Sequence, residues 1–138
     1  MPKVITYTHL LSDSAESLLQ MVRGVVSLDQ FESFRSIDGL KVRLSKSLYD
    51  VDVVILVVES KEILEEILGI MDLLRAVSVI IVLPDRDPET ISKGYSVWPR
   101  FVSYTDSDLS EIAVVLEKMI NKSVMSRVNL PYLLAGNV

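Results

Sequence analysis

The sequence predicts an α/β fold in which a five-stranded parallel sheet lies between two layers of helices. Two continuous apolar runs, Val53–Val58 and Val79–Leu83, are typical of strands that helices cover on both faces. Strand-like and helix-like segments alternate along the chain with short connections, and such alternation requires right-handed crossovers between parallel strands. Five strands at this spacing favour the order 2-1-3-4-5.

The first half of the chain contains two strand–helix units. Residues 3–8 (KVITYT) are rich in β-branched side chains and predict a strand. Asp13 and Glu16 have the spacing of a helix N-cap and its third residue, so a helix is expected over about 14–27. A weaker strand is predicted over 30–35. The next helix follows from four apolar residues at spacings of three, four and four: Ile37, Leu40, Leu44 and Leu48.

The second half continues the alternation. The predicted strands cover 51–58, 78–83 and 100–104, and the predicted helices cover 60–76, 88–96 and about 108–120. Ser60 is a suitable N-cap for the first of these helices, and Pro88 suits the first turn of the second. Asp108 and Glu111 have the spacing of a capping pair at the start of the last helix.

The composition excludes several classes of function. The 138 residues include no cysteine, which excludes disulfides, thiolate catalysis and cysteine-bound metals. A single histidine argues against multi-histidine metal sites, and the net charge of −5 argues against binding a nucleic-acid backbone. No apolar run approaches the roughly 20 residues of a membrane span, and no signal peptide is recognisable. We expect a cytoplasmic protein with a domain over 1–122 and a C-terminal tail over 123–138, without cofactor or metal.

Over residues 3–121 the chain resembles the receiver domains of two-component response regulators in length, element order and spacing. Receiver domains have a phosphoacceptor aspartate at the end of the third strand, an acidic pair after the first, a Thr or Ser that ends the fourth and a Lys that ends the fifth. The corresponding positions here hold, in that order, Val57, Thr8 with His9, Leu83 and Tyr104. The resemblance therefore implies a degenerate, non-enzymatic receiver-like module that acts in regulation or protein interaction and is not phosphorylated on aspartate.

Two alternatives use the carboxyl ends of the strands differently. A flavodoxin-like protein would bind a nucleotide or flavin there, near the hydroxyl-rich loop that follows the first strand. The candidate ligand residues are Thr8, His9, Ser12, Glu59, Asp85 and Thr105. An enzyme would use His9 with a nearby carboxylate as an acid–base pair. Each of these residues also has a purely structural interpretation. The hydroxyl side chains would cap helices, His9 would be a surface histidine, and Asp85 would belong to an acidic turn.

The helix over 60–76 has a wider apolar arc than one sheet-facing stripe needs, which indicates either a partner surface or deep packing. For the first case the candidate interface residues are Ile63, Ile67, Ile70 and Leu74, joined by Tyr132 and Leu133 of the tail. The simplest partner is a second copy in a symmetric homodimer. Trp98, the only tryptophan, is expected to be a packing residue; if exposed, it would suit a partner contact.

Overall fold

The structure is a computed structural model that describes residues 3–9 and 12–121. Five strands form one sheet in the order β2-β1-β3-β4-β5, and all four neighbouring pairs are parallel. The strands are β1 (Lys3–Thr8), β2 (Phe31–Phe34), β3 (Val51–Val57), β4 (Ser78–Leu83) and β5 (Phe101–Tyr104). The predicted fold class and strand order are confirmed.

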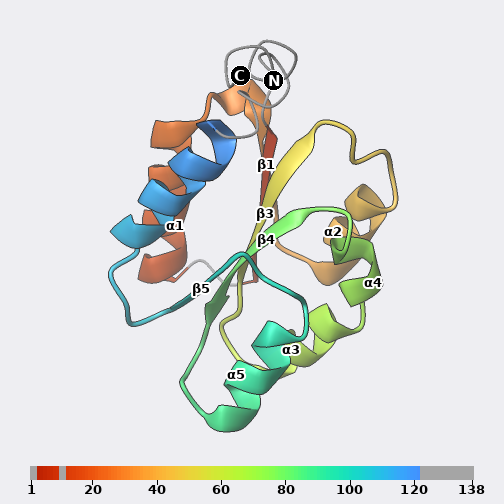
Figure 1. The fold of residues 1–138 in the computed structure, drawn as a ribbon, viewed down its shortest axis with the longest axis vertical. Coiled ribbons are helices and arrows are strands. Elements are labelled where there is room, and N and C mark those ends of the chain that lie inside the picture. Colours follow the sequence, from red (N-terminus) through yellow and green to blue (C-terminus); the bar gives the residue numbers. More distant parts are fainter. Residues whose placement is uncertain (1–2, 10–11, 122–138) are drawn as a thin grey trace, which may run out of the picture.

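Helices cover both faces of the sheet (Figure 1). The helices are α1 (Asp13–Val25), α2 (Ile37–Leu44), α3 (Lys61–Leu68), α4 (Met71–Leu74) and α5 (Pro88–Tyr95), followed by a last helical segment over 110–121. A short 3₁₀ turn, Leu28–Gln30, precedes β2. Helix α1 and residues 110–121 lie on one side of the sheet, and the other helices lie on the opposite side. Each side has its own buried apolar cluster, as a sheet covered on both faces requires.

The segment predicted as one helix over 60–76 is two helices, α3 and α4. Ser60 caps α3 as predicted, and its Oγ accepts a hydrogen bond from the Ile63 N–H at 3.3 Å. Gly69 follows the last residue of α3, and Ile70 leaves the helical conformation with φ −116° and ψ 14°. Because glycine is a poor helix former, the break falls where the intrinsic propensity is lowest.

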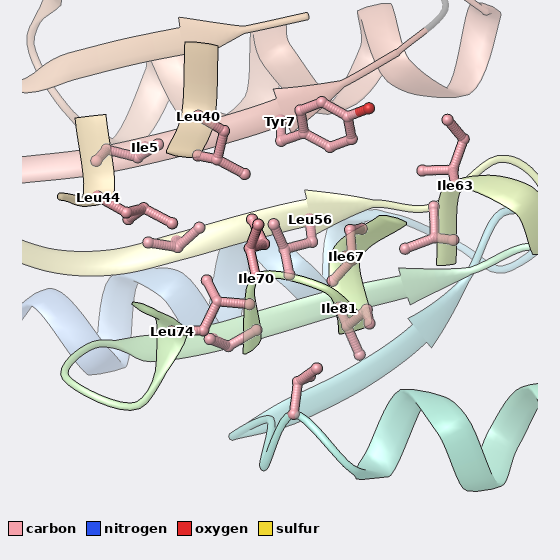
Figure 2. Packing of buried hydrophobic residues seen from close by; sticks show 14 of the residues in the cluster. Ile5, Tyr7, Leu40, Leu44, Leu56, Ile63, Ile67, Ile70, Leu74 and Ile81 are labelled. Carbon is pink, nitrogen blue, oxygen red and sulfur yellow. The ribbon is translucent and has the colours of Figure 1, made fainter. Parts of the chain in front are cut away.

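The residues proposed as an interface on this segment are core residues, which corrects that interpretation. The exposed fractions are 7% for Ile63, 0% for Ile67, 6% for Ile70 and 1% for Leu74. Figure 2 shows them packed with Ile5, Tyr7, Leu56 and Ile81 of the sheet. The wide apolar arc therefore covers the sheet, because α3 and α4 each turn their apolar face inward. The tail over 123–138, including Tyr132 and Leu133, lies outside the described residues.

Two local predictions are also corrected. The N-cap of α1 is Ser12, whose Oγ accepts from the Ala15 N–H at 3.2 Å, whereas Asp13 is the first helical residue. Trp98 is not a packing residue, because its side chain is 82% exposed. Its φ of 57° is in the left-handed region, where glycine is the usual residue after a helix. Its N–H donates to the Tyr95 carbonyl at 3.0 Å and closes a turn that follows α5.

Within 3–9 and 12–121, none of the helices combines the length and the apolar composition that a membrane crossing requires.

Candidate functional site

The candidate residues gather at the carboxyl edge of the sheet, where open α/β sheets bind their ligands. Thr8, Val57, Leu83 and Tyr104 are the last residues of β1, β3, β4 and β5. Since all strands are parallel, the segments that follow them meet at one edge and bring His9, Glu59, Asp85 and Thr105 to it. The candidate residues that follow these strands therefore share one edge of the sheet.

A row of four residues crosses this edge of the sheet. The register pairs Thr8 with Val57, Val57 with Val82, and Val82 with Ser103. Val57 and Val82 belong to the core cluster under α1 and residues 110–121, so this row faces that side. Thr8 and Ser103 are 0% and 3% exposed, and neither hydroxyl has a hydrogen-bond partner. We call these four residues the carboxyl-edge row.

Leu83 and Tyr104 are on the opposite face of the sheet from this row. Leu83 belongs to the cluster covered by α2 to α5, and Tyr104 packs against the same cluster. The strand-end residues that correspond to the functional positions of receiver domains therefore lie on two faces of the sheet. Thr8 and Val57 are on one face, and Leu83 and Tyr104 are on the other. On the face of Val57, the residues in register from β4 and β5 are Val82 and Ser103.

Several of the proposed ligand residues have local structural roles. Thr8 is buried, and Ser12 caps α1. Asp85 accepts a hydrogen bond from the Asp87 N–H at 3.0 Å, and its pKa is lowered by the Thr90 hydroxyl and by that backbone N–H. The Thr105 N–H donates to the Leu83 carbonyl at 3.0 Å. His9 is exposed and Glu59 is half-buried. Ser12 therefore forms a cap, Asp85 stabilises a turn, and the Thr105 backbone pairs with the end of β4.

An arginine-centred cluster joins two loops at this edge. Arg86 Nη1 is 2.8 Å from both carboxylate oxygens of Asp106, and Nη2 donates to Ser107 Oγ at 3.1 Å. The guanidinium carbon lies 4.2 Å from the centre of the Tyr104 ring, within the range of a cation–π interaction. We call Arg86, Tyr104, Asp106 and Ser107 the Arg86 cluster. Sequence reasoning missed it; the available signal was one arginine within an acidic turn and an aspartate after the fifth strand.

A hollow of about 400 Å³ opens beside the end of β1, between α2 and α3. We call it the α2–α3 hollow. Its lining includes Tyr7, Ile37, Asp38, Lys41, Glu66 and Ile70. Of the proposed ligand residues, His9 also lines it. Its volume is within the range of small-molecule sites.

Tyr7 is the buried polar residue of this hollow. Its side chain is 0% exposed, and its hydroxyl has no hydrogen-bond partner. Burial raises its pKa from 10.0 to about 12, with further contributions from the nearby carboxylates of Glu66 and Glu59. Tyr7 therefore stays protonated and neutral throughout the physiological pH range. Sequence reasoning had treated it only as a strand residue.

No group of three or more His, Cys, Asp or Glu side chains is placed to hold a metal ion in the described part of the chain.

Comparison with known proteins identifies the fold. No protein-family model and no curated protein matches the chain. It is similar to the crystal structure of the signal receiver domain of an HD domain-containing protein from Pseudomonas fluorescens Pf-5. The two chains are 17% identical, the match covers 91% of each, and the TM-score is 0.60. The chain therefore has the α/β fold of a receiver domain, with the strand order that the sequence predicted.

Proposed function

We propose that this chain is a receiver-like signalling domain that is not phosphorylated on aspartate and acts through contacts with a protein partner or a second copy. The observation that carries the proposal is the carboxyl-edge row. Phosphoryl transfer to a receiver needs a carboxylate nucleophile, a bound divalent ion and a cation for the developing charge. The row holds a threonine, two valines and a serine, and none of these side chains supplies such a group.

The surroundings of Val57 support the same proposal. Val57 is 2% exposed within an apolar cluster, so a phosphoryl group has no access to that position. The nearest acid along the chain, Glu59, lies beyond the end of β3. An acidic pair that could hold magnesium is missing from the residues that end β1, which are Tyr7 and Thr8.

The Arg86 cluster supports a constitutive arrangement of the two loops that follow β4 and β5. Its ion pair and hydrogen bond join these loops directly. A domain whose loops are held in this way needs another input, such as a ligand or a partner, if its surface is to change.

The direct test is incubation of the full chain with acetyl phosphate and magnesium, followed by intact-protein mass spectrometry. A phosphorylatable receiver domain treated in parallel controls for the reagents. We expect no acid-stable, base-labile gain of a phosphoryl group on this chain. A gain that disappears in Glu59→Gln would overturn the proposal and assign the acceptor to that residue.

The proposal of a homodimer now rests on a different surface, because the α3–α4 stripe is core. Trp98 and Tyr95 are 82% and 55% exposed near the end of α5, and exposed aromatic residues are common at partner contacts. Light scattering over a range of concentrations tests self-association. A mass of one chain at every concentration would leave only a different protein as partner.

A further inference from the structure

An open groove lies between the last strand of the sheet and the last helical segment. Its volume is about 470 Å³, and its lining consists of Phe101, Ser110, Glu111, Val114 and Val115. Val114 is 53% exposed, and Phe101 and Val115 are half-buried, so the groove presents apolar side chains to solvent. Strand β5 is the end strand of the sheet, and no further strand among the described residues covers this side. We call this surface the β5 groove.

The C-terminal tail contains a segment of matching chemistry. Residues 130–134 read LPYLL, and none of these five side chains carries a charge. Apolar side chains gain free energy when they leave water, and so do the apolar walls of a groove that they fill. The volume of the β5 groove is within the range that encloses a drug-sized ligand, so it has room for a few side chains.

The charges of the two surfaces are of opposite sign. Over 108–121 the acidic residues outnumber the basic ones: Asp108, Glu111 and Glu117 against Lys118. These four residues are exposed, and Glu111 lines the β5 groove itself. Residues 122–138 contain two basic side chains, Lys122 and Arg127, and no acidic one. The tail is therefore attracted to this side of the molecule, and an acidic partner would be repelled from it.

The attachment point of the tail makes this contact possible within one chain. Val114 and Asn121 are on the same helical segment, about 10 Å apart along its axis. The chain from Asn121 to Leu130 can span up to about 30 Å, which is enough to return to the level of Val114. A tethered segment has an effective concentration on the order of millimolar, which favours it over a segment of a second copy.

We propose that residues 130–134 of the tail dock in the β5 groove of the same chain, with their apolar side chains against Phe101, Val114 and Val115. The docked segment would cover this surface, so a protein partner that uses the β5 groove would have to displace it. The contact depends on the groove and the tail alone, and it is independent of whether the chain is phosphorylated.

The test uses the absence of cysteine from the chain, because one introduced cysteine is then the only attachment point for a nitroxide spin label. The label is placed beside the docking segment in Ala135→Cys, and line broadening of backbone amides is measured by NMR on the full chain. We expect the strongest broadening at Phe101, Glu111 and Val115. A tail that does not dock would instead broaden amides near its attachment, such as Gly24, which lies beside Ile120 and Asn121.

Variants in the groove connect the broadening to the proposed contact. In the labelled chain, Val114→Lys should reduce the broadening at Phe101 and Val115 at least about twofold, because a hydrated ammonium replaces an apolar contact. Val42→Lys is the matched control: Val42 is 59% exposed on α2, on the opposite side of the sheet, and the broadening should stay unchanged. Both valines are exposed, so neither change removes a core residue.

Variants in the tail test the other partner of the contact. Leu133→Asp places a charge within the docking segment and should also reduce the broadening at Phe101 and Val115 at least about twofold. Ser126→Asp adds the same charge outside residues 130–134 and should leave most of the broadening in place. Amides of β3 and β4 should keep their chemical shifts in every variant, which shows that the fold is intact.

Three results would overturn this proposal. The first is broadening concentrated around Gly24 and Asn121, with little at the β5 groove. The second is an equal effect of Val114→Lys and Val42→Lys. The third comes from a mixture of isotope-labelled chains without the nitroxide and unlabelled chains that carry it: broadening as strong as within one chain would assign the groove to the tail of a second copy. None of these results bears on phosphorylation, so this proposal and the proposed function can fail independently.

Discussion

Arg86 lies over the ring of Tyr104, with 4.2 Å between the guanidinium carbon and the ring centre, while Nη1 is 2.8 Å from both carboxylate oxygens of Asp106. The arginine precedes α5, Tyr104 is the last residue of β5 and Asp106 follows that strand, so the contact joins segments about 20 residues apart. The ring orients the guanidinium while the carboxylate neutralises it. This geometry connects the carboxyl edge of the sheet to the start of the last helical segment.

Replacement of Arg86 by glutamine should loosen these two loops without unfolding the core, because the ion pair of Arg86 with Asp106 is exposed. Hydrogen–deuterium exchange of the amides around residues 85–87 and 105–108 should become faster, while exchange in β3 and β4 stays unchanged. Arg75→Gln is the matched control, since its ion pair with Asp72 is also exposed and joins only α4 to its own C-cap residue. Equal effects of the two changes would show that the cluster does not order the loops.

The same substitution should change how stability depends on pH. The hydrogen bond from Arg86 is the main cause of the lowered pKa of the Asp106 carboxyl, whose ordinary value is 3.8. The folded state therefore gains stability from this ionised carboxylate above pH 3.8 and loses it as the pH falls through the lower folded-state pKa. Urea unfolding at a series of pH values should show a shallower acid loss in Arg86→Gln than in the wild type. An unchanged slope would contradict the assignment.

Tyr7→Phe should keep or raise stability, by up to about 1 kcal/mol, because it removes a buried hydroxyl that has no partner. Denaturant unfolding at neutral pH measures this difference. The wild-type protein should also lose stability as the pH rises from 10 toward the raised pKa of about 12, since ionisation of Tyr7 is easier in the unfolded chain. The variant should lack this alkaline component. A clear loss of stability at neutral pH would mean that the hydroxyl has a partner.

Trp98 should respond in opposite directions to two substitutions. Its φ of 57° costs an ordinary residue roughly 1–2 kcal/mol, and its exposed side chain recovers little of that through packing. Trp98→Gly should therefore raise the free energy of unfolding by about 1 kcal/mol, partly offset by glycine's larger entropy in the unfolded chain. Trp98→Val should lower it, because a β-branched side chain fits this region poorly. Stability that falls in both variants would show that the ring packs on something.

Gly94 permits close packing of α5 against β4. A Cβ at this position would lie 2.9 Å from both Cδ atoms of Leu83, which is fully buried. Gly94→Ala should therefore destabilise the fold by about 1–3 kcal/mol, as overpacking of a core does. Gly24→Ala in α1 is the control: a Cβ there meets nothing within 4 Å, so stability should rise by up to about 1 kcal/mol. Thermal or urea unfolding of the pair gives the comparison.

The sequence predicted the strands well because their signal is local. The runs that form β1, β3 and β4 are nearly all β-branched or aliphatic, and their bounds agree with the prediction to within one residue. The helix over 60–76 was predicted as one because Ile67, Ile70 and Leu74 keep their spacing across the break. Both helices bury that face on the same sheet, so the periodicity does not reveal where one ends.

The site was less predictable, because its contacts depend on the crossovers. Which residues reach the carboxyl edge follows from where each strand ends, and this was predicted. Which side of the sheet they face depends on register, so the separation of Val57 from Leu83 could not be foreseen. The pairing of Arg86 with Asp106 requires that β4 and β5 be neighbours and that their loops turn toward each other. The partnerless hydroxyl of Tyr7 is visible only once α2 and α3 are in place.

The strand order also determines how the chain can fold while it is being synthesised. Strand β1 lies between β2 and β3, so an emerging chain that has reached only α2 can pair it along one edge. Once β3 has left the ribosome, β1 is enclosed, and β4 and β5 then add outward in the order of their synthesis. Until β5 arrives, one edge of β4, with Ile80 and Val82, has no neighbouring strand. During that interval the unpaired edge of β4 is open to edge-to-edge aggregation.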